Sequence, residues 1–238
     1  MTESLTDRSS GGINSRLTAL LAAMDPSQVW RPVPGPDGTL LARGSGPDVE
    51  TLKNFVAGLD FAGKTVIDLG CNLGFFTFLA CRQGAVSALG LDSDPDVVAA
   101  ASLLAQVHGL TQACFAVRDF LAEPGEDRAD LVLAIDFIGR GVVAKGRLRD
   151  VLAAASRLAK HEIFLTLRPV YALADLPAPG EKLREIYGDF IRQDRLHLAE
   201  CAGAWLGPAW HGRPMDRGRF GNSLFKAALL FTKTASLP

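Results

Sequence analysis

TVIDLGCNLGFF, residues 65–76, decides the fold of this chain of 238 residues. Its first half is a short apolar run that contains only one charge, Asp68, which is typical of a strand buried on both faces. Gly70 and Gly74 allow a tight backbone turn, and residues 75–82 predict a helix after it. Open α/β sheets bind nucleotides at such a strand, turn and helix, with the helix N-terminus facing the ligand. We therefore expect an α/β fold with a nucleoside site at this turn.

The turn lacks the fingerprint of a dinucleotide-binding site. That fingerprint needs glycine at its first, third and sixth positions, which are Gly70, Asn72 and Phe75 here. The last glycine keeps the helix close to the strand beneath a pyrophosphate, so a phenylalanine in its place favours a ligand without one. A dehydrogenase is thus the alternative that the same fold would allow, and the turn argues against it.

A second acidic residue follows where a ribose-binding carboxylate is expected. Residues 85–91 predict a strand that ends at Asp92, close to the roughly 20 residues after Asp68 that this kind of unit requires. A carboxylate at that position can accept hydrogen bonds from both ribose hydroxyls. Asp94 and Pro95 then predict the N-cap and first residue of another helix.

Three more apolar runs follow, and a polar or charged residue comes soon after each. Parallel strands place such residues along one edge of a sheet, where ligands bind. The runs and the residues after them are 114–117 with Asp119 and Phe120, 131–135 with Asp136, and 163–167 with Arg168.

In the order of these motifs, residues 64–167 resemble the class I S-adenosylmethionine (SAM) methyltransferases. The resemblance implies a Rossmann-like sheet of seven mostly parallel strands, with helices on both faces and an antiparallel last strand. It also implies SAM as the cofactor, bound by the turn and by the ends of the following strands. The cofactor-binding residues that it implies are Asp68, Gly70, Cys71, Asn72, Gly74, Phe75, Asp92, Ser93, Asp119, Phe120 and Asp136.

Two segments are similar to the branch of this superfamily that contains the tRNA wobble-uridine modifying enzymes. These segments are residues 68–76 and 90–95. Those enzymes carry an aromatic-histidine pair after the fourth strand, where this chain has FIGRG at 137–141. The Asn-Pro-Pro-Tyr type signature of amino-group methylation on bases is also absent. An acceptor different from theirs is therefore expected.

The charge balance favours an acceptor other than nucleic acid. Lys and Arg number 25 against 26 Asp and Glu, so the chain has no broad basic surface for phosphates. The four cysteines are widely spaced, which predicts reduced thiols and no metal site. No apolar run is long enough for a membrane span and no signal peptide is evident, so we expect a cytoplasmic protein without a membrane partner.

Residues 1–60 predict a helical extension before the SAM-binding domain at 61–238. Its expected helices, 13–24 and 48–59, flank a loop rich in proline and glycine that carries Trp30 and Arg31. This loop is either a lid over the cofactor or a strap packed outside the sheet.

The acceptor is expected at the same edge of the sheet as the cofactor. Asp136 and Arg168 are well placed for it, the first as a catalytic residue. We expect a long helix at 181–201 and final strands at 204–210 and 224–232, which leaves residues 210–220 as a loop. In that loop His211 could take a proton, while Arg213, Arg217 and Arg219 could clamp a carboxylate or phosphate or merely solvate the loop.

These patterns together predict a SAM-dependent methyltransferase for an anionic small-molecule or peptidyl acceptor. An RNA (tRNA) methyltransferase is the first alternative. A SAM-binding protein without catalytic activity is the second.

Overall fold

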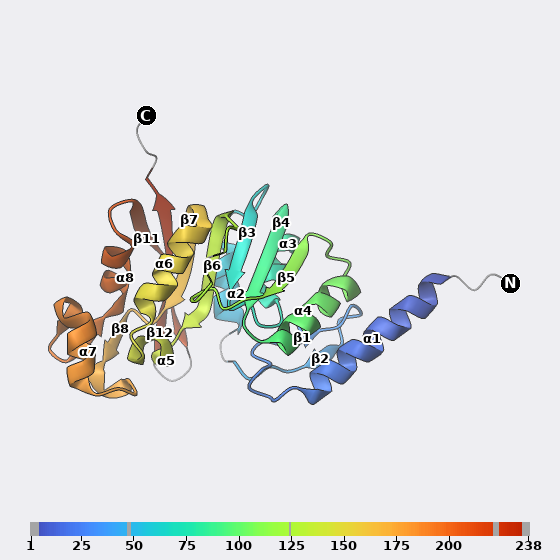
Figure 1. Cartoon of the computed structure of the whole chain (residues 1–238), viewed down its shortest axis with the longest axis horizontal. Coiled ribbons are helices and arrows are strands. Elements are labelled where there is room, and N and C mark those ends of the chain that lie inside the picture. Colours follow the sequence, from blue (N-terminus) through green and yellow to red (C-terminus); the bar gives the residue numbers. More distant parts are fainter. Residues whose placement is uncertain (1–4, 47–48, 124, 221–223, 235–238) are drawn as a thin grey trace. The chain divides into compact units, whose positions relative to one another are not determined.

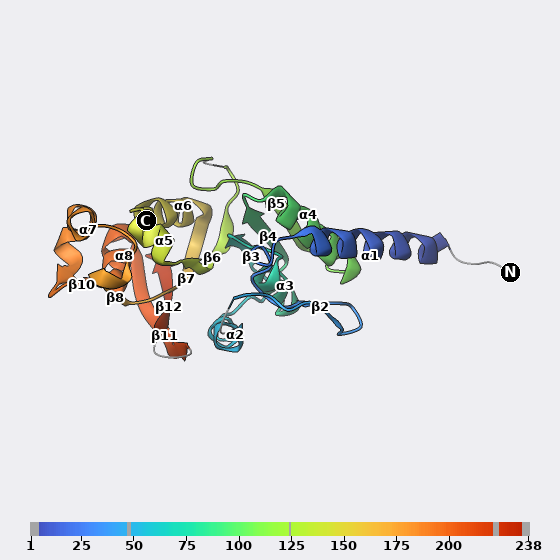
Figure 2. The same cartoon turned by 90° about the horizontal axis from the view of Figure 1, so that it is seen from below.

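The computed structural model describes residues 5–46, 49–123, 125–220 and 224–234, apart from the side chains of 5–11, 216–220 and 224–225. The chain divides into two compact units. The first unit combines residues 1–49 with 61–120, and the second combines 50–60 with 121–238. Each unit is described by itself below, and Figures 1 and 2 show the elements of both.

The main sheet has seven strands in the order β11-β12-β7-β6-β3-β4-β5. In the first unit β3 is parallel to β4 and β4 to β5, and in the second unit β6 is parallel to β7. Strand β12 runs antiparallel to both β7 and β11. The predicted Rossmann-like fold with an antiparallel last strand is therefore confirmed. The strands are β3 (Thr65–Leu69), β4 (Ser87–Asp92), β5 (Ala113–Val117), β6 (Ala129–Ile138), β7 (Ala159–Leu167), β11 (Trp210–Phe220) and β12 (Leu224–Lys233).

Two helices of the first unit pack against its three parallel strands. Helix α3 (Phe75–Arg82) contacts β3, β4 and β5, and α4 (Pro95–Val107) contacts β4 and β5. Asp94 caps α4 as predicted, because its side chain accepts the backbone N–H groups of residues 96 and 97 and Pro95 follows it. Helix α1 (Leu5–Ala23) lies along α4 (Figure 1), and a short hairpin of β1 (Val33–Pro34) and β2 (Leu40–Ala42) follows it.

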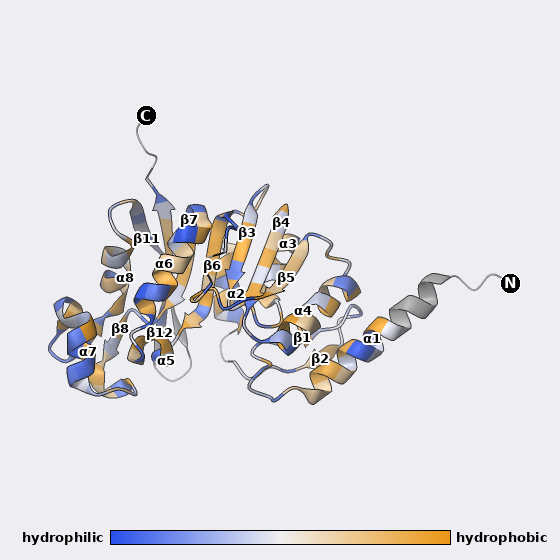
Figure 3. Ribbon diagram, in the orientation of Figure 1, coloured by the Kyte–Doolittle hydropathy of each residue, from blue (hydrophilic) through white to orange (hydrophobic). Residues whose placement is uncertain are grey.

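The second unit covers its strands with helices that have one apolar face. Helix α6 (Leu148–Leu158) packs on β6 and β7, and α8 (Leu198–Leu206) packs on α6 and β11. In Figure 3 the strands β6 and β7 are coloured mostly as hydrophobic, whereas α7 carries hydrophilic residues. The remaining elements are α2 (Val49–Ala57), α5 (Arg140–Ala144), β8 (Val170–Ala172), η1 (Leu173–Asp175), α7 (Gly180–Tyr187), η2 (Gly188–Phe190), β9 (Ile191–Arg192) and β10 (Arg195–His197).

Three expectations for the last third of the chain were wrong. The helix predicted at 181–201 is a short helix followed by a β9–β10 hairpin, whose turn holds Gln193 and Asp194 at positive φ. The strand predicted at 204–210 falls in the end of α8 and the turn after it. The loop predicted at 210–220 is strand β11, paired along its length with β12. No helix in the described part of the chain is both long and apolar enough to cross a membrane.

The turn between β3 and α3 is crowded by a phenylalanine from β5. Gly74 has φ 81°, and a Cβ atom there would lie 2.5 Å from the ring of Phe115. Gly109, after α4, has φ 64° with no atom within 4 Å of such a Cβ. The two glycines therefore share a left-handed backbone but differ in the space around them.

We expect Gly74→Ala to lower the free energy of unfolding by about 3 kcal/mol and Gly109→Ala by about 1 kcal/mol. The left-handed conformation costs each alanine about 1 kcal/mol, and overpacking against Phe115 adds about 2 kcal/mol at position 74 only. Urea denaturation of both variants and the wild type measures the difference. Equal losses would contradict the proposed crowding.

Asp68 is a charged residue inside the core of the first unit. It is only 2% exposed, and its Oδ2 atom accepts a hydrogen bond of 2.8 Å from the Thr77 hydroxyl on α3. Burial raises the pKa of this carboxyl group from 3.8 to about 6, and the Thr77 hydrogen bond opposes the rise only in part. The folded protein therefore holds a proton at Asp68 at pH values where the unfolded chain has lost it.

Asp68 should make the protein less stable as the pH rises from about 4 to about 6. In that window the unfolded state binds fewer protons than the native state, so the free energy of unfolding falls, by up to about 3 kcal/mol for this group. Asp68→Asn should remove that part of the pH dependence, and urea denaturation at several pH values would detect it. Asp96→Asn, at an exposed position of α4, is the control. A stability difference between wild type and Asp68→Asn that is constant with pH would contradict the assignment.

Candidate active site

The turn after β3 is held to the end of β4 by backbone hydrogen bonds. The N–H groups of Gly70 and Cys71 both donate to the Leu91 carbonyl, at 2.9 and 3.1 Å. Gly70 and Asn72 have positive φ, 69° and 49°, which glycine adopts freely and asparagine tolerates better than most residues. The sequence therefore folds into this turn without a bulky residue in a strained conformation.

The carboxylate of Asp92 lies at the centre of this arrangement. Its Oδ2 accepts the backbone N–H of Asn72 at 2.9 Å, and its Oδ1 accepts that of Asp94 at 3.1 Å. A carboxylate offers about four acceptor positions, so two hydroxyl groups can still bind here. These two hydrogen bonds hold the carboxylate in one orientation, and its binding of a ribose remains a prediction.

Two of the expected cofactor residues, one in β3 and one in the turn, are buried. Asp68 contacts Thr77, and Cys71 is 5% exposed. Burial, with the nearby charges of Asp68 and Asp92, raises the pKa of the Cys71 thiol well above its usual value, so this thiol stays protonated.

The other expected cofactor residues of the first unit occupy different environments. Phe75 begins α3, and its ring packs edge-to-face on that of Phe76 with 5.1 Å between the ring centres. Ser93 and Asp119 are exposed, whereas Phe120 is 5% exposed. Their contacts with a cofactor remain predictions.

The loop around Trp30 and Arg31, expected to be a lid or a strap, binds the same turn through hydrogen bonds that the sequence did not indicate. The side-chain amide of Asn72 donates to the Gln28 carbonyl at 2.6 Å and accepts the Trp30 N–H at 3.1 Å. The side chain of Gln28 donates to the Asp94 carboxylate at 2.7 Å. These hydrogen bonds join residues more than 40 positions apart, so no local pattern could have predicted them.

In the second unit, Asp136 lies near the carboxyl end of β6 in an unusual conformation. Its φ is 57°, and its N–H donates to the Thr166 hydroxyl on β7 at 2.7 Å. Its carboxylate forms an ion pair with Lys226 on β12, and the two side chains are only 10% and 20% exposed. The sequence predicted Asp136 but missed Lys226, which lies within strand β12 and belongs to no motif.

Arg168 follows β7, at the same end of the strand. Its guanidinium pairs with Asp175 at 3.0 Å and lies 4.8 Å from the centre of the Tyr171 ring. The side chain is 23% exposed. These contacts fix its direction and leave part of the guanidinium accessible.

The arginine loop expected at 210–220 does not exist, because these residues form β11. His211 lies opposite Thr232, which in turn lies opposite Glu162 near the start of β7. His211 is therefore at the amino end of the parallel strands, away from the expected acceptor, and the premise for its role as a base was wrong.

The three arginines of β11 occupy different levels of this strand. Arg213 is exposed and lies level with the middle of β7. The backbone of Arg217 lies level with Leu167, and Arg219 follows it, but their side chains are outside the described part.

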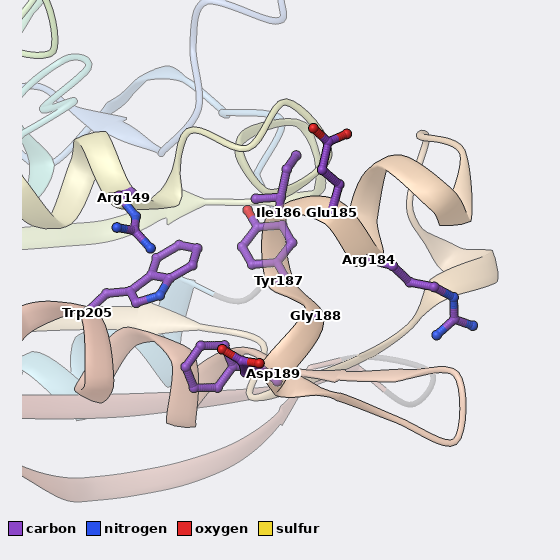
Figure 4. Close-up of a pocket in the computed structure, with 9 residues that line it drawn as sticks. Arg149, Arg184, Glu185, Ile186, Tyr187, Gly188, Asp189 and Trp205 are labelled. Atoms are coloured by element: carbon purple, nitrogen blue, oxygen red, sulfur yellow. The ribbon is translucent and has the colours of Figure 1, made fainter.

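A hollow of about 300 Å³ lies elsewhere in the second unit, among α6, α7 and α8. Figure 4 shows Trp205 between Arg149 and Tyr187 in its wall. The Arg149 guanidinium is 4.4 Å from the indole ring, and the Tyr187 ring stacks on it at 5.3 Å. These contacts pack the helices together. Within the described residues, no cluster of three metal-ligating side chains occurs.

Comparison with known proteins identifies the family. Residues 60–204 match the model of a methyltransferase domain. Among curated relatives, the ribosomal protein L11 methyltransferase of Serratia proteamaculans is 33% identical over 60% of this chain and 49% of its own length. That of Aeromonas hydrophila is 29% identical over 72% and 57%. The chain thus spans about half the length of the curated relatives it matches.

Solved structures share the fold. The bifunctional kinase-methyltransferase WbdD has a TM-score of 0.60 at 17% identity, over 91% of this chain and 46% of its own. Magnesium protoporphyrin IX methyltransferase from Synechocystis PCC 6803, solved with bound SAH, has a TM-score of 0.53 at 19% identity, over 78% and 83%. Through the match over residues 60–204, the chain belongs to the methyltransferase-domain family, and it shares the fold of solved methyltransferases.

Proposed function

We propose that this protein transfers the methyl group of SAM to a peptidyl acceptor. The name of the curated relatives, ribosomal protein L11 methyltransferase, supports an acceptor of this class. A small anionic molecule and an RNA are the other acceptors that the sequence allows. The near-neutral charge of the chain gives no support to the RNA.

The observation that carries this proposal is the ion pair of Asp136 and Lys226 at the carboxyl end of β6. Ligands of open parallel sheets bind outside the carboxyl ends of the strands. A carboxylate at that edge, oriented by an ammonium group and by its own backbone, can accept a hydrogen bond from an acceptor N–H or O–H. Asp136 is thus the candidate for orienting the acceptor or removing its proton.

Methyl transfer from SAM requires few further groups of the protein. The sulfonium of SAM is a good leaving group, so the reaction needs an acceptor held in line with the methyl group and, for some acceptors, a base. Arg168, fixed by Asp175 and Tyr171, can bind a negative group on the same acceptor. We place both functions on the strand ends of the second unit.

Incubation of cell extract with the pure protein and methyl-labelled SAM tests the acceptor class. We expect the label in material that protease digests and nuclease leaves intact, with ribosomal proteins as the first purified panel. Label in nuclease-sensitive material, with binding that weakens steeply as salt is added, would show an RNA acceptor instead. Label only in small, protease-resistant compounds would show a small-molecule enzyme.

With the labelled acceptor in hand, Lys226→Gln should lower kcat/KM for that acceptor by roughly tenfold to a hundredfold, because Asp136 loses a charged partner. The affinity for SAM should stay unchanged, and Lys226→Arg should restore part of the activity by keeping the charge. Lys233→Gln, at an exposed position on the same strand, is the matched control. Wild-type kinetics for Lys226→Gln would contradict the role of the pair.

A further inference from the structure

Residues 28–31, which we call the strap, lie against the cofactor turn of the first unit. Asn72 binds the strap on one side through Gln28 and Trp30, as described above. On the other side, the N–H of Ser45 donates to the Val29 carbonyl at 2.8 Å, and the N–H of residue 46 donates to the Trp30 carbonyl at 2.8 Å. The strap is therefore held between the turn and the segment that follows the β1–β2 hairpin.

Arg31 attaches the end of the strap to helix α3. The residue is only 3% exposed, and its guanidinium lies 5.9 Å from the centres of both the Trp30 ring and the Phe76 ring. The backbone at residue 44 packs so tightly here that a Cβ atom would lie 2.4 Å from the Arg31 carbonyl carbon. Trp30 itself remains 39% exposed.

Asn72 is the residue through which the strap and the ribose carboxylate meet. Its backbone N–H is held by Asp92, and its side-chain amide holds two backbone groups of the strap. Gln28 adds a second link, to Asp94, which also donates its N–H to Asp92. Each oxygen of the Asp92 carboxylate is thus hydrogen-bonded to a residue, Asn72 or Asp94, whose side chain is in turn hydrogen-bonded to the strap.

We propose that the strap is one wall of the SAM site, and that Asn72 is the positioning residue that couples its order to cofactor binding. A ligand on Asp92 fixes the carboxylate, the carboxylate fixes the Asn72 backbone, and the Asn72 amide fixes the strap. Thermodynamic linkage makes this coupling reciprocal. Loss of the strap contacts therefore lowers the affinity for the cofactor by the same factor by which the bound cofactor stabilises the ordered strap. The inference rests on SAM as the cofactor and is independent of the acceptor.

Hydrogen exchange of the whole chain, with and without S-adenosylhomocysteine (SAH), tests the coupling. SAH should slow exchange at the Trp30 amide, whose N–H donates to Asn72. A strap that merely packs against the unit would exchange at the same rate in both states. The probe needs no acceptor, so the result does not depend on the proposed peptidyl substrate.

Asn72→Gly is the sharpest variant, because glycine keeps the positive φ without strain and removes only the side-chain amide. The loss of two hydrogen bonds should weaken the binding of SAH by roughly tenfold to thirtyfold, as measured by calorimetric titration. It should also abolish the effect of SAH on hydrogen exchange at the Trp30 amide. Gln28→Ala, which keeps the turn intact, should weaken SAH by roughly fivefold. Gln106→Ala, at an exposed position on α4, is the matched control and should bind normally.

Two results would overturn the proposal. One is unchanged Trp30 exchange when wild-type protein is saturated with SAH. The other is wild-type SAH affinity in a folded Asn72→Gly variant, or in Gln28→Ala if the first variant does not fold.

Discussion

The carboxylate of Asp92 closes the turn after β3, and the arrangement of the candidate cofactor site depends on it. By accepting the N–H groups of Asn72 and Asp94 it ties the turn after one strand to the loop after the next. Hydrogen bonds to a charged acceptor are roughly twice as strong as neutral ones. The same carboxylate is the one that we expect to bind the ribose of the cofactor.

Around the turn after β3, the surrounding side chains leave no room for a residue larger than glycine at positions 74 and 90. Phe115 from β5 fills the space next to Gly74 and Gly90, where a Cβ atom at either position would come within 2.7 Å of the ring. A glycine in a strand weakens it in isolation, but here it admits a ring that packs the three strands together. Gly90 thus has a packing reason, and Gly74 has a packing reason in addition to its positive φ.

The sequence predicted the parallel part of the fold well because its signals are local. Buried strands show as apolar runs, Asp94 and Pro95 mark a helix start, and a residue that follows a strand must lie at its carboxyl end. These rules sufficed for Asp92 and Asp136. They also placed Arg168 correctly without any knowledge of Asp175 or Tyr171.

The rest of the chain could not be predicted because long-range pairing overrides local preference. Strand β11 contains Gly212, Pro214 and Gly218, which are typical of a loop, yet β12 pairs with it along its length. As the last strand in the order of the sheet it tolerates a proline, and the register shift between Pro214 and Asp216 absorbs it. The hydrogen bonds of the strap and the ion pair of Lys226 were missed for a similar reason, since their partners are distant in sequence.

The conformation of Asp136 is the strongest physical argument for a role beyond stability. A left-handed conformation at a residue other than glycine costs about 1 kcal/mol or more, and partial burial of its charge adds to that. The Thr166 hydroxyl on β7 and the Lys226 ammonium group on β12 offset these costs. The pairing of these two strands brings both groups to Asp136. An asparagine or glycine would fit the same backbone without the charge, so the backbone conformation alone does not explain an aspartate. Strained residues held in place by their surroundings cluster at functional sites, and the end of a parallel strand is where such a site is expected.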